Sequence, residues 1–138
     1  MTTFVSYSAF DKDKVERLID DLRAHGVDVW FDQDDLLVGD DLEAKIEVAI
    51  MAAKKIIICV SKSFNEKPPT SWVKVELSIA HQRETTEGKN YIVPVRLDRG
   101  ATIPDEIAKR VYADISSQEK WKMNLPRLVK ALKATSPP

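Results

Sequence analysis

Apolar residues along the chain follow two alternating patterns, short apolar runs and longer segments with helical spacing. The short runs predict strands at residues 4–7, 27–31, 56–60, 91–97 and 111–114. After the first run, apolar residues recur every three or four positions up to Gly26, where a helix would end. The same spacing predicts helices over residues 42–53, 72–85 and 119–133.

Strands that alternate with helices predict a doubly wound α/β fold. Parallel strands joined by right-handed helical crossovers are the usual result of this alternation. The third run, residues 56–60, is apolar at every position, which is typical of a central strand covered on both faces. We therefore expect a flavodoxin-like, five-stranded parallel sheet in the order 2-1-3-4-5, with helices on both faces.

The length of the chain, 138 residues, fits one domain of this kind. We expect the domain to cover residues 1–135. Residues 136–138, Ser-Pro-Pro, have the composition of a tail or the start of a linker.

The charge balance limits the classes of partner. Lys and Arg total 21 and Asp and Glu total 22, so no basic field is expected that would hold nucleic acid or an anionic membrane. The N-terminal residues lack the pattern of a signal peptide, and no apolar stretch reaches the length of about 20 residues that spans a bilayer. The single cysteine, Cys59, lies in an apolar run and suits a reducing compartment. We expect a cytoplasmic protein whose partners are small molecules or other proteins.

Glu76 breaks the pattern of the helix predicted over residues 72–85. It lies in the middle of an arc of apolar residues on the helical wheel, where a core residue is expected. Burying an unpaired carboxylate costs several kcal/mol or raises its pKa, so its position needs a cause. One explanation is a structural ion pair with Arg83 or Lys45. The other is that Glu76 faces a ligand cleft.

The position of Glu76 in the predicted topology suits the second explanation. Ligands of open parallel sheets bind beyond the carboxyl ends of the strands, at the point where the strand order reverses. Glu76 lies in the first turns of the helix that leaves the third strand, and Trp72 is four residues earlier on the same face. An indole beside a carboxylate suits a flat, cationic ring such as nicotinamide, although core packing also explains Trp72.

Five segments together resemble the Toll/interleukin-1 receptor (TIR) domain of the bacterial, NAD-consuming kind. They are Phe4-Val5-Ser6-Tyr7-Ser8, Asp11, Val29-Trp30-Phe31-Asp32, Leu37-Val38-Gly39-Asp40 and Trp72-Val73-Lys74-Val75-Glu76. Each motif is weak alone, but their order and spacing cover essentially the whole chain. The resemblance implies an NAD+ glycohydrolase or cyclase that cleaves the nicotinamide–ribose bond, in immune-type or cell-death signalling such as antiviral defence.

The same resemblance implies roles for individual residues. Glu76 corresponds to the catalytic glutamate of the family. The substrate-binding residues that it implies are Ser6, Tyr7, Ser8, Asp32, Gly39 and Trp72. Some animal relatives carry arginines just after the tyrosine, where this chain has Ser8 and Ala9, so phosphate contacts at that point are in doubt. Residues 32–41 correspond to the BB loop, through which other TIR domains would bind and form an oligomer.

One carboxylate is enough for the implied chemistry, because nicotinamide leaves as a neutral molecule from a ribosyl cation. NAD+ would be the substrate, and no separate cofactor is expected. The acidic run at residues 32–37 has leucines where a calcium loop needs a ligand and a glycine, so no metal site is expected. The chain has no glycine-rich nucleotide motif. The alternative function is a non-catalytic TIR adaptor that acts through homotypic contacts.

Overall fold

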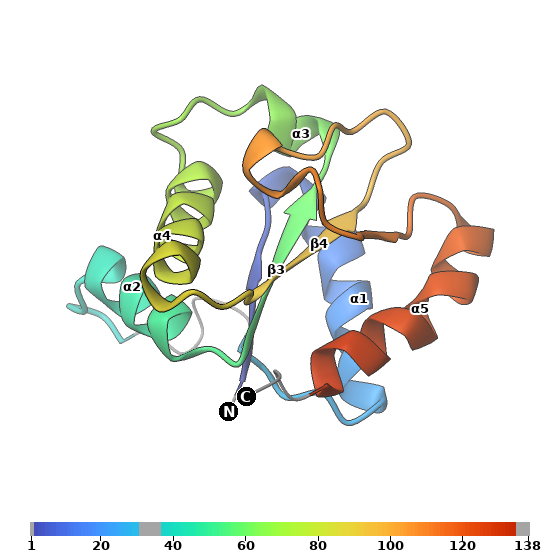
Figure 1. Ribbon diagram of the computed structural model, residues 1–138, viewed down its shortest axis with the longest axis horizontal. Coiled ribbons are helices and arrows are strands. Elements are labelled where there is room, and N and C mark those ends of the chain that lie inside the picture. Colours follow the sequence, from blue (N-terminus) through green and yellow to red (C-terminus); the bar gives the residue numbers. More distant parts are fainter. Residues whose placement is uncertain (1, 31–36, 135–138) are drawn as a thin grey trace.

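The computed structural model describes residues 2–30 and 37–134, and in them it confirms the predicted sheet. Five parallel strands lie in the order β2-β1-β3-β4-β5 (Figure 1). Their bounds are β1 Thr3–Ser6, β2 Val29–Trp30, β3 Lys55–Val60, β4 Ile92–Arg96 and β5 Ala113–Asp114. The strand β3, apolar at every position from Ile56 to Val60, is central, as its composition predicts.

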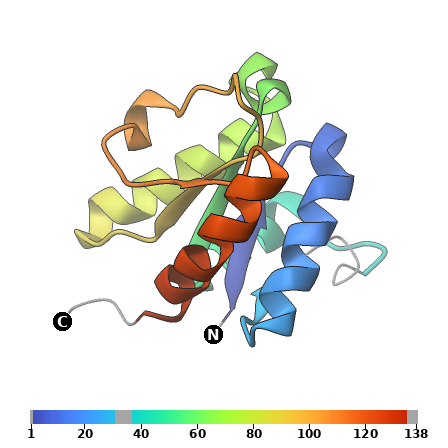
Figure 2. The same cartoon turned by 90° about the vertical axis from the view of Figure 1, so that its right-hand side faces the viewer.

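The helices form two layers, one on each face of the sheet (Figures 1 and 2). The α1 (Lys12–Ala24) and α5 (Gln118–Lys133) helices cover one face, and α2 (Leu42–Ala52) and α4 (Trp72–Glu87) cover the other. None of the helices in the described part of the chain is long and apolar enough to cross a membrane.

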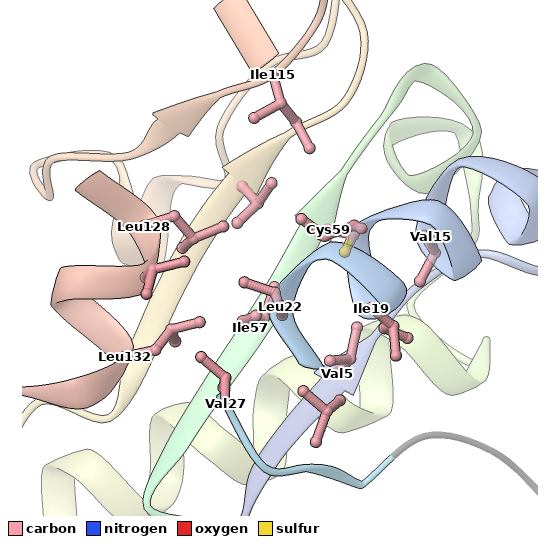
Figure 3. Packing of buried hydrophobic residues seen from close by; sticks show 14 of the residues in the cluster. Val5, Val15, Ile19, Leu22, Val27, Ile57, Cys59, Ile115, Leu128 and Leu132 are labelled. Carbon is pink, nitrogen blue, oxygen red and sulfur yellow. The ribbon is translucent and has the colours of Figure 1, made fainter. Parts of the chain in front are cut away.

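Side chains of each strand alternate between two separate hydrophobic cores. Val5, Ile57 and Cys59 point toward α1 and α5 (Figure 3). Phe4 and Ile56 belong to the core under α2 and α4. Burial raises the pKa of the Cys59 thiol, so this cysteine behaves as a small apolar residue.

The segment at residues 61–71, between the predicted strand 56–60 and the predicted helix 72–85, contains an additional short helix, α3 (Lys62–Glu66). The Ser61 hydroxyl caps this helix by accepting a hydrogen bond from the Phe64 N–H, 3.0 Å away. Hydrophobic periodicity misses the helix because five residues are too few to show it. A short turn near Ile107 is present as η3 (Asp105–Ile107), and η1 (Ala9–Asp11) precedes α1.

Two polar clusters fix the C-terminal half of α4. Arg83 donates hydrogen bonds to the carbonyl oxygens of Ile50 and Ala53, 2.9 and 2.8 Å away, at the end of α2. Glu84 accepts hydrogen bonds from the N–H groups of Tyr91 and Ile92, and it forms an ion pair with Arg110. Gly88, with a φ of 67°, then ends the helix in the left-handed conformation. The orientation of α4, and so of Glu76, is therefore set by contacts far from Glu76.

Candidate active site

A cavity of about 410 Å³ opens on the face of the sheet that α2 and α4 cover. We call it the α2–α4 cavity. Its lining residues come from β1 and the residues after it, from β2, from α2, and from the start of α4 with the segment before it. They are Phe4, Val5, Tyr7, Ser8, Ala9, Trp30, Leu42, Ile46, Lys67, Ser71, Trp72, Val73 and Glu76. The cavity thus lies where β1 ends and α4 begins, the position that the topology predicts for a ligand.

Aromatic and aliphatic side chains line the part of the cavity next to the sheet. The rings of Phe4 and Trp30 stack with their centroids 5.2 Å apart. Leu42 and Ile46 line it from α2. These side chains make an apolar surface that suits a flat ring, and they lower the local dielectric around any charge in the cavity.

Glu76 is the buried acid of this cavity, with 9% of its surface exposed. Its Oε1 accepts a hydrogen bond from the Ser6 hydroxyl, 2.9 Å away. Its Oε2 has no hydrogen-bond partner among the residues that the structure describes, and Glu76 makes no ion pair with any of them. The ion pair with Arg83 or Lys45 is therefore wrong as an explanation of Glu76, because Arg83 binds the end of α2 and Glu87 instead.

Burial raises the pKa of Glu76 to about 7, and the hydrogen bond from Ser6 opposes this shift. Desolvation has the larger effect, and no cation among the described residues pairs with the carboxylate to compensate for the lost water. Near neutral pH the carboxyl group therefore exists in both forms. The charged form can stabilise a cation in the cavity, and the neutral form can donate a hydrogen bond.

Trp72, Tyr7 and Ser8, three of the predicted substrate-binding residues, line the same cavity as Glu76. Trp72 is 44% exposed, so its indole is not buried in the core and is accessible to a ligand. Ser8 is buried and shares a hydrogen bond of 2.6 Å with Ser63. The structure thus brings these residues together, while their binding roles stay predictions.

The other predicted residues lie elsewhere. Ser6 does not line the cavity, and its hydroxyl instead donates the hydrogen bond to Glu76. Gly39 is exposed, has a φ of 97° and does not line the cavity. Asp32 lies outside the described residues.

Sequence reasoning missed the aliphatic lining from α2 and missed Lys67. Leu42 and Ile46 show only the periodicity of core residues, so nothing in the pattern distinguishes a cavity lining from a filled core. Lys67 follows α3, in a segment without periodicity, and no local signal placed it near Glu76. In the part of the chain that the structure covers, no cluster of His, Cys, Asp and Glu side chains could hold a metal ion.

The family model and two curated relatives relate this chain to one family. The family model of the TIR domain matches residues 3–129. The 2′ cyclic ADP-D-ribose synthase BtTIR of Bacteroides thetaiotaomicron is 36% identical over 93 residues, which are 67% of this chain and 31% of that protein. The NAD(+) hydrolase TcpC of Escherichia coli O6:H1 (strain CFT073) is 32% identical over 93 residues, 67% of this chain and 29% of that protein. The matched region thus spans under a third of each of these two relatives.

Solved structures with the same fold include the TIR domain of the Toll-related receptor TRR-2 from Hydra magnipapillata. It superimposes with a TM-score of 0.72 at 17% identity, covering 96% of this chain and 98% of that one. At this identity the likeness concerns the fold alone. With the family model matching nearly the whole length, the chain belongs to the TIR domain family.

Proposed function

We propose that this chain cleaves the nicotinamide–ribose bond of NAD+ and releases nicotinamide together with ADP-ribose or a cyclic ADP-ribose. The observation that carries the proposal is Glu76, a buried carboxylate with one oxygen that has no hydrogen-bond partner among the described residues, in an apolar cavity that Trp72 also lines. The curated names of two relatives, a cyclic ADP-ribose synthase and an NAD(+) hydrolase, support it.

The proposed reaction needs one negative charge next to the ribose. When the bond between C1′ and the ring nitrogen breaks, its electron pair goes to nicotinamide, which leaves neutral, and the ribose carries the positive charge. The Glu76 carboxylate stabilises this charge in a low-dielectric cavity and holds the ribose hydroxyls. Water then attacks C1′ and loses a proton, which gives ADP-ribose. Attack by the adenine ring of the same molecule gives a cyclic product.

The raised pKa of Glu76 fits this use. The Ser6 hydroxyl favours the charged form, and the cationic nicotinamide ring of bound NAD+ favours it further. Substrate binding therefore lowers the pKa of Glu76 and ionises the group when it is needed. Trp72 stacks on the nicotinamide ring at the mouth of the cavity, and Tyr7 and Ser8 contact the sugar.

The proposal includes activation by self-assembly in the cytoplasm, through the BB loop at residues 32–41. Leu37 and Val38, in the described part of this loop, are 75% and 109% exposed. Exposed apolar side chains at a loop tip suit burial against another TIR domain. Consumption of NAD+ or release of a cyclic product would then serve as the signal in cell death or antiviral defence.

The same two side chains are the observation that favours a non-catalytic adaptor, because an adaptor also needs an apolar loop for homotypic contacts. An adaptor, however, gains nothing from a buried carboxylate such as Glu76, which has no cationic partner in the part of the chain that the structure describes and therefore destabilises the fold. We therefore favour the enzyme.

The test measures nicotinamide release from NAD+ by the purified chain, at high protein concentration and after clustering through an added oligomerisation tag. Glu76→Gln should lower turnover at least about 100-fold, because the neutral amide cannot stabilise the ribosyl cation. The control is Glu47→Gln, an exposed glutamate on α2 outside the cavity.

Unchanged turnover in Glu76→Gln would remove Glu76 from the mechanism. If the clustered wild-type chain released no nicotinamide, the adaptor would be the better explanation. A specific activity that does not rise with protein concentration would contradict activation by assembly.

A further inference from the structure

The α2–α4 cavity has two charged lining residues within the described chain, Glu76 and Lys67, and only Glu76 has a role so far. Lys67 directly follows α3, and its backbone N–H donates to the Phe64 carbonyl oxygen, 3.2 Å away. Its side chain is exposed and forms no ion pair with any residue that the structure describes. Lys67 is therefore a cation at a cavity wall, anchored at its backbone and available to an anion.

The two charges occupy different parts of the cavity. Glu76 is buried in the second turn of α4, whereas Lys67 is exposed and precedes the helix. The segment that joins α3 to α4 passes over the N-terminal end of α4 (Figure 1). The pKa of Glu76 reflects burial and the Ser6 hydrogen bond, with no contribution from a lysine charge. The cavity thus has an acid in its interior and a separate cation at its mouth.

The start of α4 strengthens the positive field at the mouth. The Ser71 hydroxyl donates to the Pro68 carbonyl oxygen, 2.8 Å away, and does not cap the first turn of the 16-residue helix. Within the described residues the N–H groups of Trp72 and Val73, at the start of that turn, donate no hydrogen bond, and together with the positive end of the helix dipole they add to the charge of Lys67.

This arrangement of charges matches the two ends of a nucleotide. A cavity of 410 Å³ is at the small end of ligand pockets, which range over roughly 300–1,000 Å³, so it holds part of a dinucleotide. With the nicotinamide riboside next to Glu76, the pyrophosphate leaves the cavity at its mouth. An ammonium group binds a phosphate as a point charge and requires no fixed geometry.

Resting on the proposed function, we infer that Lys67 binds the pyrophosphate of the substrate and makes the site selective for a phosphorylated nucleotide over its nucleoside. Lys67 acts in binding and touches none of the reacting atoms. It should therefore affect KM and leave kcat nearly unchanged.

The experiment compares NAD+ with nicotinamide riboside, which has the same reacting bond and no phosphate. Lys67→Gln should raise the KM for NAD+ about fivefold, with kcat changed less than twofold, and leave the KM for nicotinamide riboside unaltered. Lys122→Gln, an equal change of charge at an exposed position on α5, should alter neither. An equal effect of Lys67→Gln on both substrates, or none on NAD+, would overturn the inference and leave the proposed function intact.

A binding measurement separates the two proposals. By calorimetry, wild-type protein should bind ADP-ribose about fivefold more tightly than Lys67→Gln does, whether or not NAD+ is cleaved. If wild-type protein releases no nicotinamide but this difference in affinity holds, the proposed function fails and the phosphate contact stands. Equal affinity of the two proteins for ADP-ribose would overturn the phosphate contact.

Discussion

Each face of the sheet is covered by two helices, but the space between helices and sheet is filled differently on the two faces. On the face covered by α1 and α5, buried apolar side chains fill the space, as Leu22, Ile57 and Leu128 do in Figure 3. On the face covered by α2 and α4, the space between helix and strand includes the α2–α4 cavity, with Glu76 in its wall.

Both faces are formed by the same strands, so the difference between them lies in the side chains that the helices pack against each face. Phe4 and Val5 are neighbours on β1, and each is almost fully buried, but they belong to different cores, and the apolar lining of the cavity comes mainly from the core of Phe4. The packed face gains the dispersion contacts and apolar burial that stabilise a small domain. The other face gives up part of these contacts, and it places an acid where packing would favour an apolar side chain. The candidate active site is thus located where the fold is less stable than it could be.

Truncating one isoleucine on each face tests this contrast, and it has the largest expected effect. Ile19→Ala on α1 should lower the free energy of unfolding by about 4 kcal/mol, because Ile19 is enclosed and its removal leaves a void. Ile46→Ala on α2 should lower it by only about 2 kcal/mol, because Ile46 already borders a cavity. Urea denaturation at neutral pH measures both values.

The two substitutions should also separate by function. Ile46→Ala should raise the KM for NAD+, whereas Ile19→Ala should leave the KM of the folded fraction unaltered. Equal losses of stability at the two positions would mean that the α2–α4 cavity closes by repacking, and the contrast between the faces would then be wrong.

The sequence predicted the fold further than it predicted the site. Strand positions and the order of the sheet follow from alternating apolar patterns, and the confirmed central position of β3 follows from its apolar composition alone. Strand ends differ by one to a few residues because pairing partners, which are distant in sequence, decide where each ladder stops. The second strand was predicted over residues 27–31, but β2 is Val29–Trp30, and residue 31 lies outside the described residues.

The site was predictable only where a residue broke a local pattern. Glu76 is polar on an apolar arc, so the helical wheel marked it, and Trp72 followed from its spacing to Glu76. The contact between Ser6 and Glu76 joins residues 70 positions apart, and no periodicity records such a distance. Likewise, Arg83 does not pair with Glu76 because it donates hydrogen bonds to the carbonyl groups at the end of α2, which the helical wheel does not show.

Replacing the acid itself should reveal the stability given up at the cavity. Unfolded Glu76 ionises near its ordinary pKa of 4.5 and folded Glu76 near 7, so the folded state holds the extra proton between these values. Stability of the wild-type protein therefore falls as pH rises from 4.5 to 7, by about 3 kcal/mol in total, and is constant with respect to this group above 7. Glu76→Gln keeps an oxygen for the Ser6 hydroxyl and carries no titrating group.

Relative to wild type, Glu76→Gln should therefore become more stable as the pH is raised from 5 to 8, by about 2–3 kcal/mol. Urea denaturation of both proteins at the two pH values gives the difference, and Glu47→Gln, at an exposed position, should show none of it. If the free energies of unfolding of wild type and Glu76→Gln changed with pH in parallel, Glu76 would not be desolvated in the folded chain.

The smallest effect should come from the hydrogen bond that Glu76 accepts from Ser6. If the carboxylate is the active form, kcat/KM for NAD+ should rise tenfold per pH unit below the pKa of about 7 and level off above it. Ser6→Ala removes the donor that favours the charged form, so the midpoint of this profile should move upward, by up to about one unit. Activity would then be several-fold lower at pH 6.5 and would recover by pH 9.

Ser78→Ala, at an exposed position on α4 outside the cavity, should leave the midpoint unchanged. If Ser6→Ala lowered kcat/KM by the same factor at every pH, Ser6 would instead act through packing. Only a group that changes the ionisation of Glu76 moves the midpoint of the profile.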